Sequence, residues 1–182
     1  NLADFGSGLE ISLDQIALFV ATRELAHARL FRHAKWLRLH VISSITEFAR
    51  GFRVDTFSFE CFAARLDLQP PEEPRAARES GALLPGRTEA QEATLARLES
   101  MLASVEGWVD VVTADATARL PKADAIAEVV RRRRAAGGPA EQAFSSLVGL
   151  QLRPRRLREA AAMWRTITDA VGIEARDSLW DY

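Results

Sequence analysis

This chain of 182 residues has few of the features that mark several protein classes. Cys61 is the only cysteine, so no internal disulfide can form and a cysteine-based zinc site is excluded. The longest apolar runs are far shorter than a membrane span, and there is no glycine-rich phosphate loop. The serine pairs Ser43-Ser44 and Ser145-Ser146 lack the flanking glycines of a nucleophile elbow, so the sequence does not support a serine hydrolase.

The chain also lacks an excess of either charge. The formal net charge is −1 and the isoelectric point is near 6.4, which argues against a dedicated nucleic-acid binder. We therefore expect a peptide-like substrate or a protein partner, without membrane or nucleic acid. The single cysteine favours a reducing, cytoplasmic compartment. The length suits one domain over residues 1–182, and the ends of the chain lead us to expect a fragment of a longer protein.

The residues that are present predict an all-α fold. Ser12-Leu13-Asp14-Gln15 and Thr88-Glu89-Ala90-Gln91 are capping boxes, and Ile11 and Ile16 can form a hydrophobic staple around the first. Apolar residues recur at helical spacing and no strand-like alternation stands out. We expect a loop over 69–86, the four tryptophans as core or interface anchors, and helices over 13–33, 37–52, 56–66, 88–119, 121–137, 139–150 and 154–172.

The helix over 13–33 carries an incomplete metalloprotease motif, Arg23-Glu24-Leu25-Ala26-His27. In H-E-x-x-H the two histidines lie one turn apart and bind zinc, and the glutamate is the general base. Arg23 replaces the first histidine, and a guanidinium stays protonated and cannot bind a metal. E-x-x-H alone is a weak signal, because a solvated Glu24 beside a partly buried His27 is an ordinary helix surface. A di-iron bundle would need a second E-x-x-H, which the sequence lacks.

The long helix over 88–119 carries a second motif, Glu106-Gly107-Trp108-Val109-Asp110. In zincins of the glutamate type, the glutamate of E-x-x-x-D is the third metal ligand, and the aspartate orients a ligand histidine. Two carboxylates in an apolar stretch are costly unless they are paired. We therefore expect Glu106 and Asp110 to face polar groups, although they could also line the solvated edge of the helix.

Five stretches of the chain, taken together and in this order, resemble one protein family: Arg23–Phe31, Lys35–Arg38, Val105–Asp110, Gly137–Gln142 and Leu147–Arg156. The family consists of bacterial zincin-like hydrolases, and one of its branches is named for its association with deazaflavin-coenzyme biosynthesis. The resemblance implies a mostly helical zincin-like fold, with the motif helix packed on the E-x-x-x-D helix. It also implies a zinc-dependent metallopeptidase activity, with zinc ligands at positions 23, 27 and 106 and Glu24 as base.

Arg23 departs from that family pattern. The residues that match it are Glu24 as the base, His27 and Glu106 as metal ligands, and Asp110 as the orienting residue. Two protein ligands would remain where a catalytic zinc has three, so we expect zinc to be absent. One hypothesis is a metallohydrolase with a degenerate site. The alternative is an inactive zincin-like pseudoenzyme that binds or scaffolds, in which Arg23 pairs with Glu106 or Glu24 in place of the metal.

Overall fold

The computed structural model describes residues 11–50, 88–136 and 156–181, and every regular element among them is a helix. The expected all-α fold is confirmed. In chain order the helices are α2 (Leu13–His33), α3 (Lys35–Arg50), α6 (Glu89–Ala116), α7 (Ala123–Ala136) and α9 (Leu157–Ser178). Among the described residues, no helix is long and apolar enough to cross a membrane.

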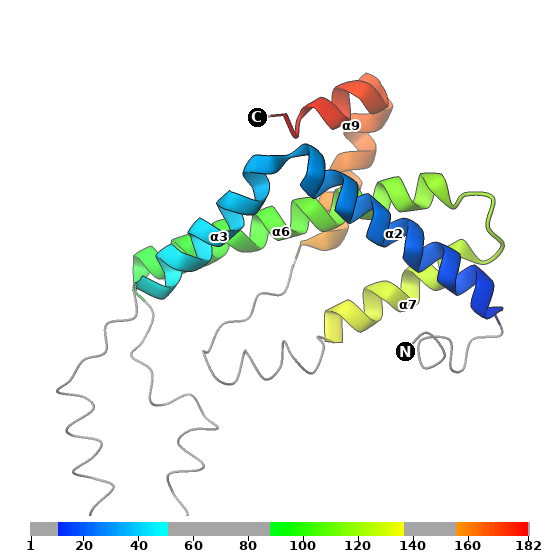
Figure 1. Ribbon diagram of the computed structural model, residues 1–182, viewed down its shortest axis with the longest axis horizontal. Helices are drawn as coiled ribbons and strands as arrows, with labels where there is room; N and C mark the ends of the chain where they lie inside the picture. Colours follow the sequence, from blue (N-terminus) through cyan, green and yellow to red (C-terminus); the bar gives the residue numbers. More distant parts are fainter. Residues whose placement is uncertain (1–10, 51–87, 137–155, 182) are drawn as a thin grey trace, which may run out of the picture.

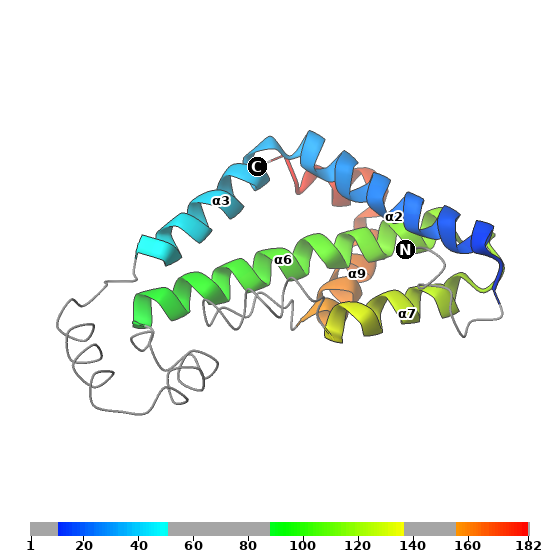
Figure 2. The ribbon, with the colours of Figure 1, turned by 60° about the horizontal axis from the view of Figure 1, so that its bottom comes forward.

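Helix α6 is the axis of the fold, and the four other helices all pack against it (Figure 1). Helices α2 and α3 follow each other along α6 and meet at an angle, as Figure 2 shows, and Ala34 joins them. The motif helix α2 therefore lies on the long helix that carries Glu106 and Asp110, as the resemblance implies.

The start of each long helix is fixed by a cap. The capping box of α6 is complete: the Gln91 amide donates to Thr88 Oγ1 at 3.2 Å, and the Thr88 amide donates to Gln91 Oε1 at 2.9 Å. The capping box predicted for α2 forms only in part. Ser12 Oγ accepts from the Gln15 amide at 3.5 Å, but Gln15 Oε1 is buried without a hydrogen-bond partner.

Two apolar clusters hold the helices together. The larger lies where α2, α3, α6 and α9 meet. It includes Trp108, Trp164 and Trp180, and the partly buried Trp36 packs against it, which confirms the expected role of the tryptophans as anchors. The smaller joins α2 to α7 through Ile16, Phe19, Ile126 and Val130. Fully burying a side chain of this size stabilises a fold by about 1.5–3 kcal/mol, so both clusters fix the position of α2 on its neighbours.

A glycine beside Glu106 sets how closely α9 approaches α6. A Cβ atom added at Gly107 would lie 2.7 Å from the backbone and the Cβ of Ala160, which is closer than real contacts allow. The two helices can therefore cross here only because position 107 has no side chain. This crossing supports the backbone of α6 at the point where it presents Glu106.

The end of α9 differs from the prediction. We expected the last helix to stop at Gly172, but helical structure resumes after that residue and continues to Ser178. Gly172 has φ of +81° and ψ of 173°, so it forms a kink rather than an end. Past the kink the chain turns back, and Arg176 Nη1 reaches Thr168 Oγ1 at 3.3 Å.

The other helix limits follow the prediction closely. Helix α2 has the predicted bounds, whereas α3 begins two residues earlier than expected and α6 ends three residues earlier. The helices expected over 56–66 and 139–150, the loop over 69–86 and the helix start at Pro154 lie outside the described residues.

Candidate functional site

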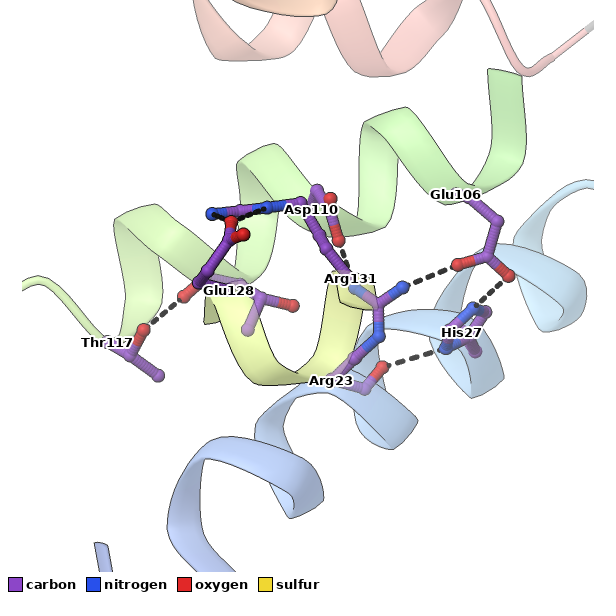
Figure 3. Close-up of polar contacts among 8 residues, drawn as sticks. Arg23, His27, Glu106, Asp110, Thr117, Glu128 and Arg131 are labelled. Atoms are coloured by element: carbon purple, nitrogen blue, oxygen red, sulfur yellow. Dashed lines mark hydrogen bonds and ion pairs between the residues drawn. The ribbon is translucent and has the colours of Figure 1, made fainter. Parts of the chain in front are cut away.

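The two sequence motifs meet at the contact between α2 and α6. Arg23 and His27 lie one turn apart on α2, and Glu106 and Asp110 lie one turn apart on α6. Figure 3 shows the four side chains pointing toward one another across this contact. We call these four residues the Arg23 cluster.

The guanidinium of Arg23 lies between the two carboxylates. Its Nη2 donates to Glu106 Oε2 at 2.5 Å, and its Nη1 donates to Asp110 Oδ1 (Figure 3). Arg23 is only 4% exposed and Glu106 only 7%. Burying an arginine away from water is costly unless its charge is paired and its N–H groups are bonded. The two carboxylates satisfy both conditions.

His27 completes the cluster from the other side of Glu106. Its Nε2 lies 3.2 Å from Glu106 Oε1, and its Nδ1 lies 3.1 Å from the backbone oxygen of Arg23. Both ring nitrogens of His27 therefore lie beside oxygen atoms of the cluster, one of the backbone and one of the Glu106 carboxylate.

Glu24 lies outside the cluster. It is exposed on α2, and its side chain has no hydrogen bond or ion pair within the described residues. Of the two partners considered for Arg23, the structure brings Glu106 to it and leaves Glu24 facing solvent. Asp110 likewise contacts Arg23, whereas the orienting role implied by the resemblance would pair it with a histidine.

The donor set does not fit a zinc ion. Of the described residues in the cluster, His27 and Glu106 match the ligand positions of the family, and both Glu106 oxygens already accept from Arg23 or face His27. Zinc binding also requires a ligand nitrogen that faces the metal with a free lone pair, and His27 Nε2 faces Glu106 Oε1 instead. Throughout the described stretches, no group of three or more His, Cys, Asp or Glu side chains is arranged to hold a metal ion. The guanidinium of Arg23 lies where a third ligand would be needed.

A second buried arginine, Arg176, supports Trp108, which lies between Glu106 and Asp110 in the sequence of α6. Trp108 Nε1 donates to Asp177 Oδ1 at 2.9 Å, and Arg176 Nε donates to the same oxygen at 2.8 Å. The Arg176 guanidinium carbon lies 5.9 Å from the centre of the Trp108 ring. The sequence analysis missed Arg176 and Asp177, because it ended the last helix at Gly172. The Arg-Asp pair after Gly172 was the signal that could have revealed them.

Helix α7 carries the nearest further ion pairs, which Figure 3 shows for Glu128 and Arg131. Glu128 bonds to Arg132 Nε at 2.9 Å and to Arg131 Nη2 at 3.1 Å. The hydrogen bond from Arg132, followed by that from Arg131, holds the pKa of Glu128 below its ordinary value. Four consecutive arginines begin at Arg131, and Glu128 of the same helix partly neutralises their charge.

The chain matches the family described as zincin-like metallopeptidase over residues 1–182. No match was found among curated proteins or among solved structures. The match covers the whole chain, and the chain therefore belongs to the zincin-like metallopeptidase family.

Proposed function

We propose that this member of the zincin-like family is a pseudoenzyme, which keeps the helical fold as a binding or scaffolding module and has lost the metal. The observation that carries the proposal is the Arg23 guanidinium, which bonds to Glu106 on one side and to Asp110 on the other. A zinc ion at this point would meet a permanent positive charge at hydrogen-bond distance from one of its two remaining ligands. Coulomb repulsion between such charges is large in a buried site.

The pseudoenzyme proposal also accounts for the two acidic residues. In a metal site Glu106 would neutralise zinc, and here it neutralises Arg23. Charge-assisted bonds between arginine and carboxylates are short and strong, and the planar guanidinium can bond to two partners at once. Arg23 can therefore join α2 to α6 in the way that a shared metal would.

A metallohydrolase is the second candidate, and family membership favours it. Glu24, His27, Glu106 and Asp110 all match the complete site of the family. In that function Glu24 would act as the general base. It would accept a proton from a water molecule, and its exposed position on α2 leaves it open to solvent and to a substrate.

A peptidase assay separates the two candidates. Wild-type protein and the Glu24→Gln variant are incubated with unfolded casein and added zinc, and new amino termini are measured. The pseudoenzyme proposal expects the same background rate from both. Hydrolysis by the wild type that is lost in Glu24→Gln would establish the metallohydrolase instead. Arg23→His in the same assay tests whether restoring the first histidine of the motif is enough to restore hydrolysis.

A further inference from the structure

Positive charge is concentrated around the junction of α2 and α3. Residues 25–46 contain no aspartate or glutamate, although the chain as a whole has a net charge of −1. All three histidines of the chain lie in this stretch, together with Arg29, Arg32, Lys35 and Arg38. The balanced total charge therefore hides a local excess of cations.

These four cations have no partner among residues 11–50, 88–136 and 156–181, which the structure describes. Each is exposed, and none of their side chains forms a hydrogen bond or an ion pair within the part of the chain that the structure describes. Acidic residues border this stretch: Glu24 precedes Leu25 and is exposed, and Asp181 Oδ1 lies 2.6 Å from His33 Nε2. Four neighbouring like charges repel one another, so an external anion would relieve that repulsion.

Large apolar side chains lie between the cations. Leu25 is 69% exposed and Leu39 is 70% exposed, the highest values among the large apolar residues of the described chain. Phe31, between Arg29 and Arg32, is also exposed. We call this set the apex surface, and it consists of Leu25, Arg29, Phe31, Arg32, Lys35, Arg38 and Leu39.

The apex surface is convex. Figure 2 shows α2 and α3 meeting at an apex that stands away from α6. Leu30 and Leu37, which are buried on either side of the junction, belong to the same cluster as residues of α6. The exposed side chains of the same turns therefore face outward. A convex surface cannot enclose a peptide, and a nucleic acid would leave the exposed leucines without apolar contact.

We propose that the apex surface docks on an anionic lipid bilayer, a partner that the balanced total charge of the sequence did not lead us to expect. Lysine and arginine side chains near an anionic membrane surface are attracted to lipid headgroups, and exposed leucine and phenylalanine can enter the boundary between headgroups and acyl chains. Such docking requires no helix that crosses the membrane. It is also independent of the pseudoenzyme proposal, because Arg23 and His27 lie on the face of α2 that contacts α6.

The test is sedimentation with large vesicles. One set consists of phosphatidylcholine, and the other of equal parts phosphatidylcholine and phosphatidylglycerol. We expect the wild type to sediment with the anionic vesicles and to stay in solution with the neutral ones. Removing a cation near the surface lowers the partition coefficient about fivefold, so Arg29→Ala combined with Lys35→Ala should lower it on the order of 25-fold. Raising the salt should release the wild type.

A matched control and an apolar variant complete the experiment. Arg158 and Arg165 are exposed on α9 outside the apex surface, and replacing both by alanine changes the net charge equally. This control should bind as the wild type does. Leu39→Ala should lower binding on the order of tenfold, whereas Met163→Ala, at an exposed position on α9, should not. Circular dichroism melting checks that each variant is folded.

Three results would overturn the proposal. The first is wild-type protein that stays in solution with anionic vesicles at low salt. The second is an equal loss of binding in the apex and control variants, because the effect would then be one of total charge. The third is binding of polyglutamate or an oligonucleotide, weakened by the apex variants, without binding to vesicles.

Discussion

Replacing Arg23 with alanine removes the guanidinium that joins α2 to α6. Glu106, 7% exposed, and the nearly buried Asp110 would then face each other without the guanidinium that bonds to both of them. Breaking a buried ion pair by removing one partner costs about 3–5 kcal/mol. For a chain of this length, that loss lowers the melting temperature by roughly 6–20 °C. Urea unfolding followed by circular dichroism measures the free energy of unfolding directly.

Two further variants show whether the cost comes from the pair itself. Combining Arg23→Ala with Glu106→Gln removes one stranded charge, so the double variant should be more stable than the sum of the single losses predicts, by at least about 1 kcal/mol. Arg97→Ala is the matched control, because Arg97 pairs with Glu47 at 3.6 Å with both side chains mostly exposed. The free energy of unfolding of that variant should fall by about 1 kcal/mol or less. Additive losses in the cycle, or equal losses from Arg23→Ala and Arg97→Ala, would refute the reasoning.

Three other predictions concern the metal, the helix crossing and the α7 ion pairs. Arg23→His should raise zinc affinity, measured by competition with a chromophoric chelator; an unchanged affinity would mean that His27 and Glu106 are no longer placed for a metal. Gly107→Ala should destabilise the fold by about 1–3 kcal/mol in urea unfolding, because its Cβ would overlap Ala160; an unaffected variant would show that α9 can move away from α6. Because the pKa of Glu128 is lowered in the folded chain, its ion pairs should stabilise the fold above about pH 4.3, the ordinary glutamate value, and that contribution should fade as the pH falls through the lowered pKa. Arg132→Ala should raise that pKa in an NMR titration, and an unchanged value would contradict the assigned cause.

The helices that the sequence predicted best are those with local signals. Ser12 and Thr88 each cap the helix that follows them, and the bounds of α2 agree with the prediction at both ends. Gly172 shows the limit of local reading. A glycine after a helical stretch marks an end or a kink equally well, and contacts of the later residues decide which. Here the buried Arg176 and the bond from Trp108 to Asp177 hold the second part of α9 in place.

The candidate site was predictable as a meeting of two motifs, but its pairing was predictable only as a choice between Glu106 and Glu24 as the partner of Arg23. Apolar surroundings indicated that Glu106 and Asp110 need a partner, and Arg23 was one of few cations on the facing helix. Helical spacing places Glu106 and Asp110 on one face of α6, but it does not say how α2 is rotated against that face. That rotation turns Arg23 and His27 inward and leaves Glu24 exposed, and it follows from packing against α6 and α7.

Zinc content of the purified protein tests the central claim most directly. The protein is purified from cells grown with added zinc, and zinc per chain is measured by elemental analysis beside the His27→Ala variant. If Arg23 has replaced the metal, the wild type should hold far less than one zinc per chain, and His27→Ala should not change the value. One tightly held zinc per wild-type chain that disappears in His27→Ala would contradict the claim.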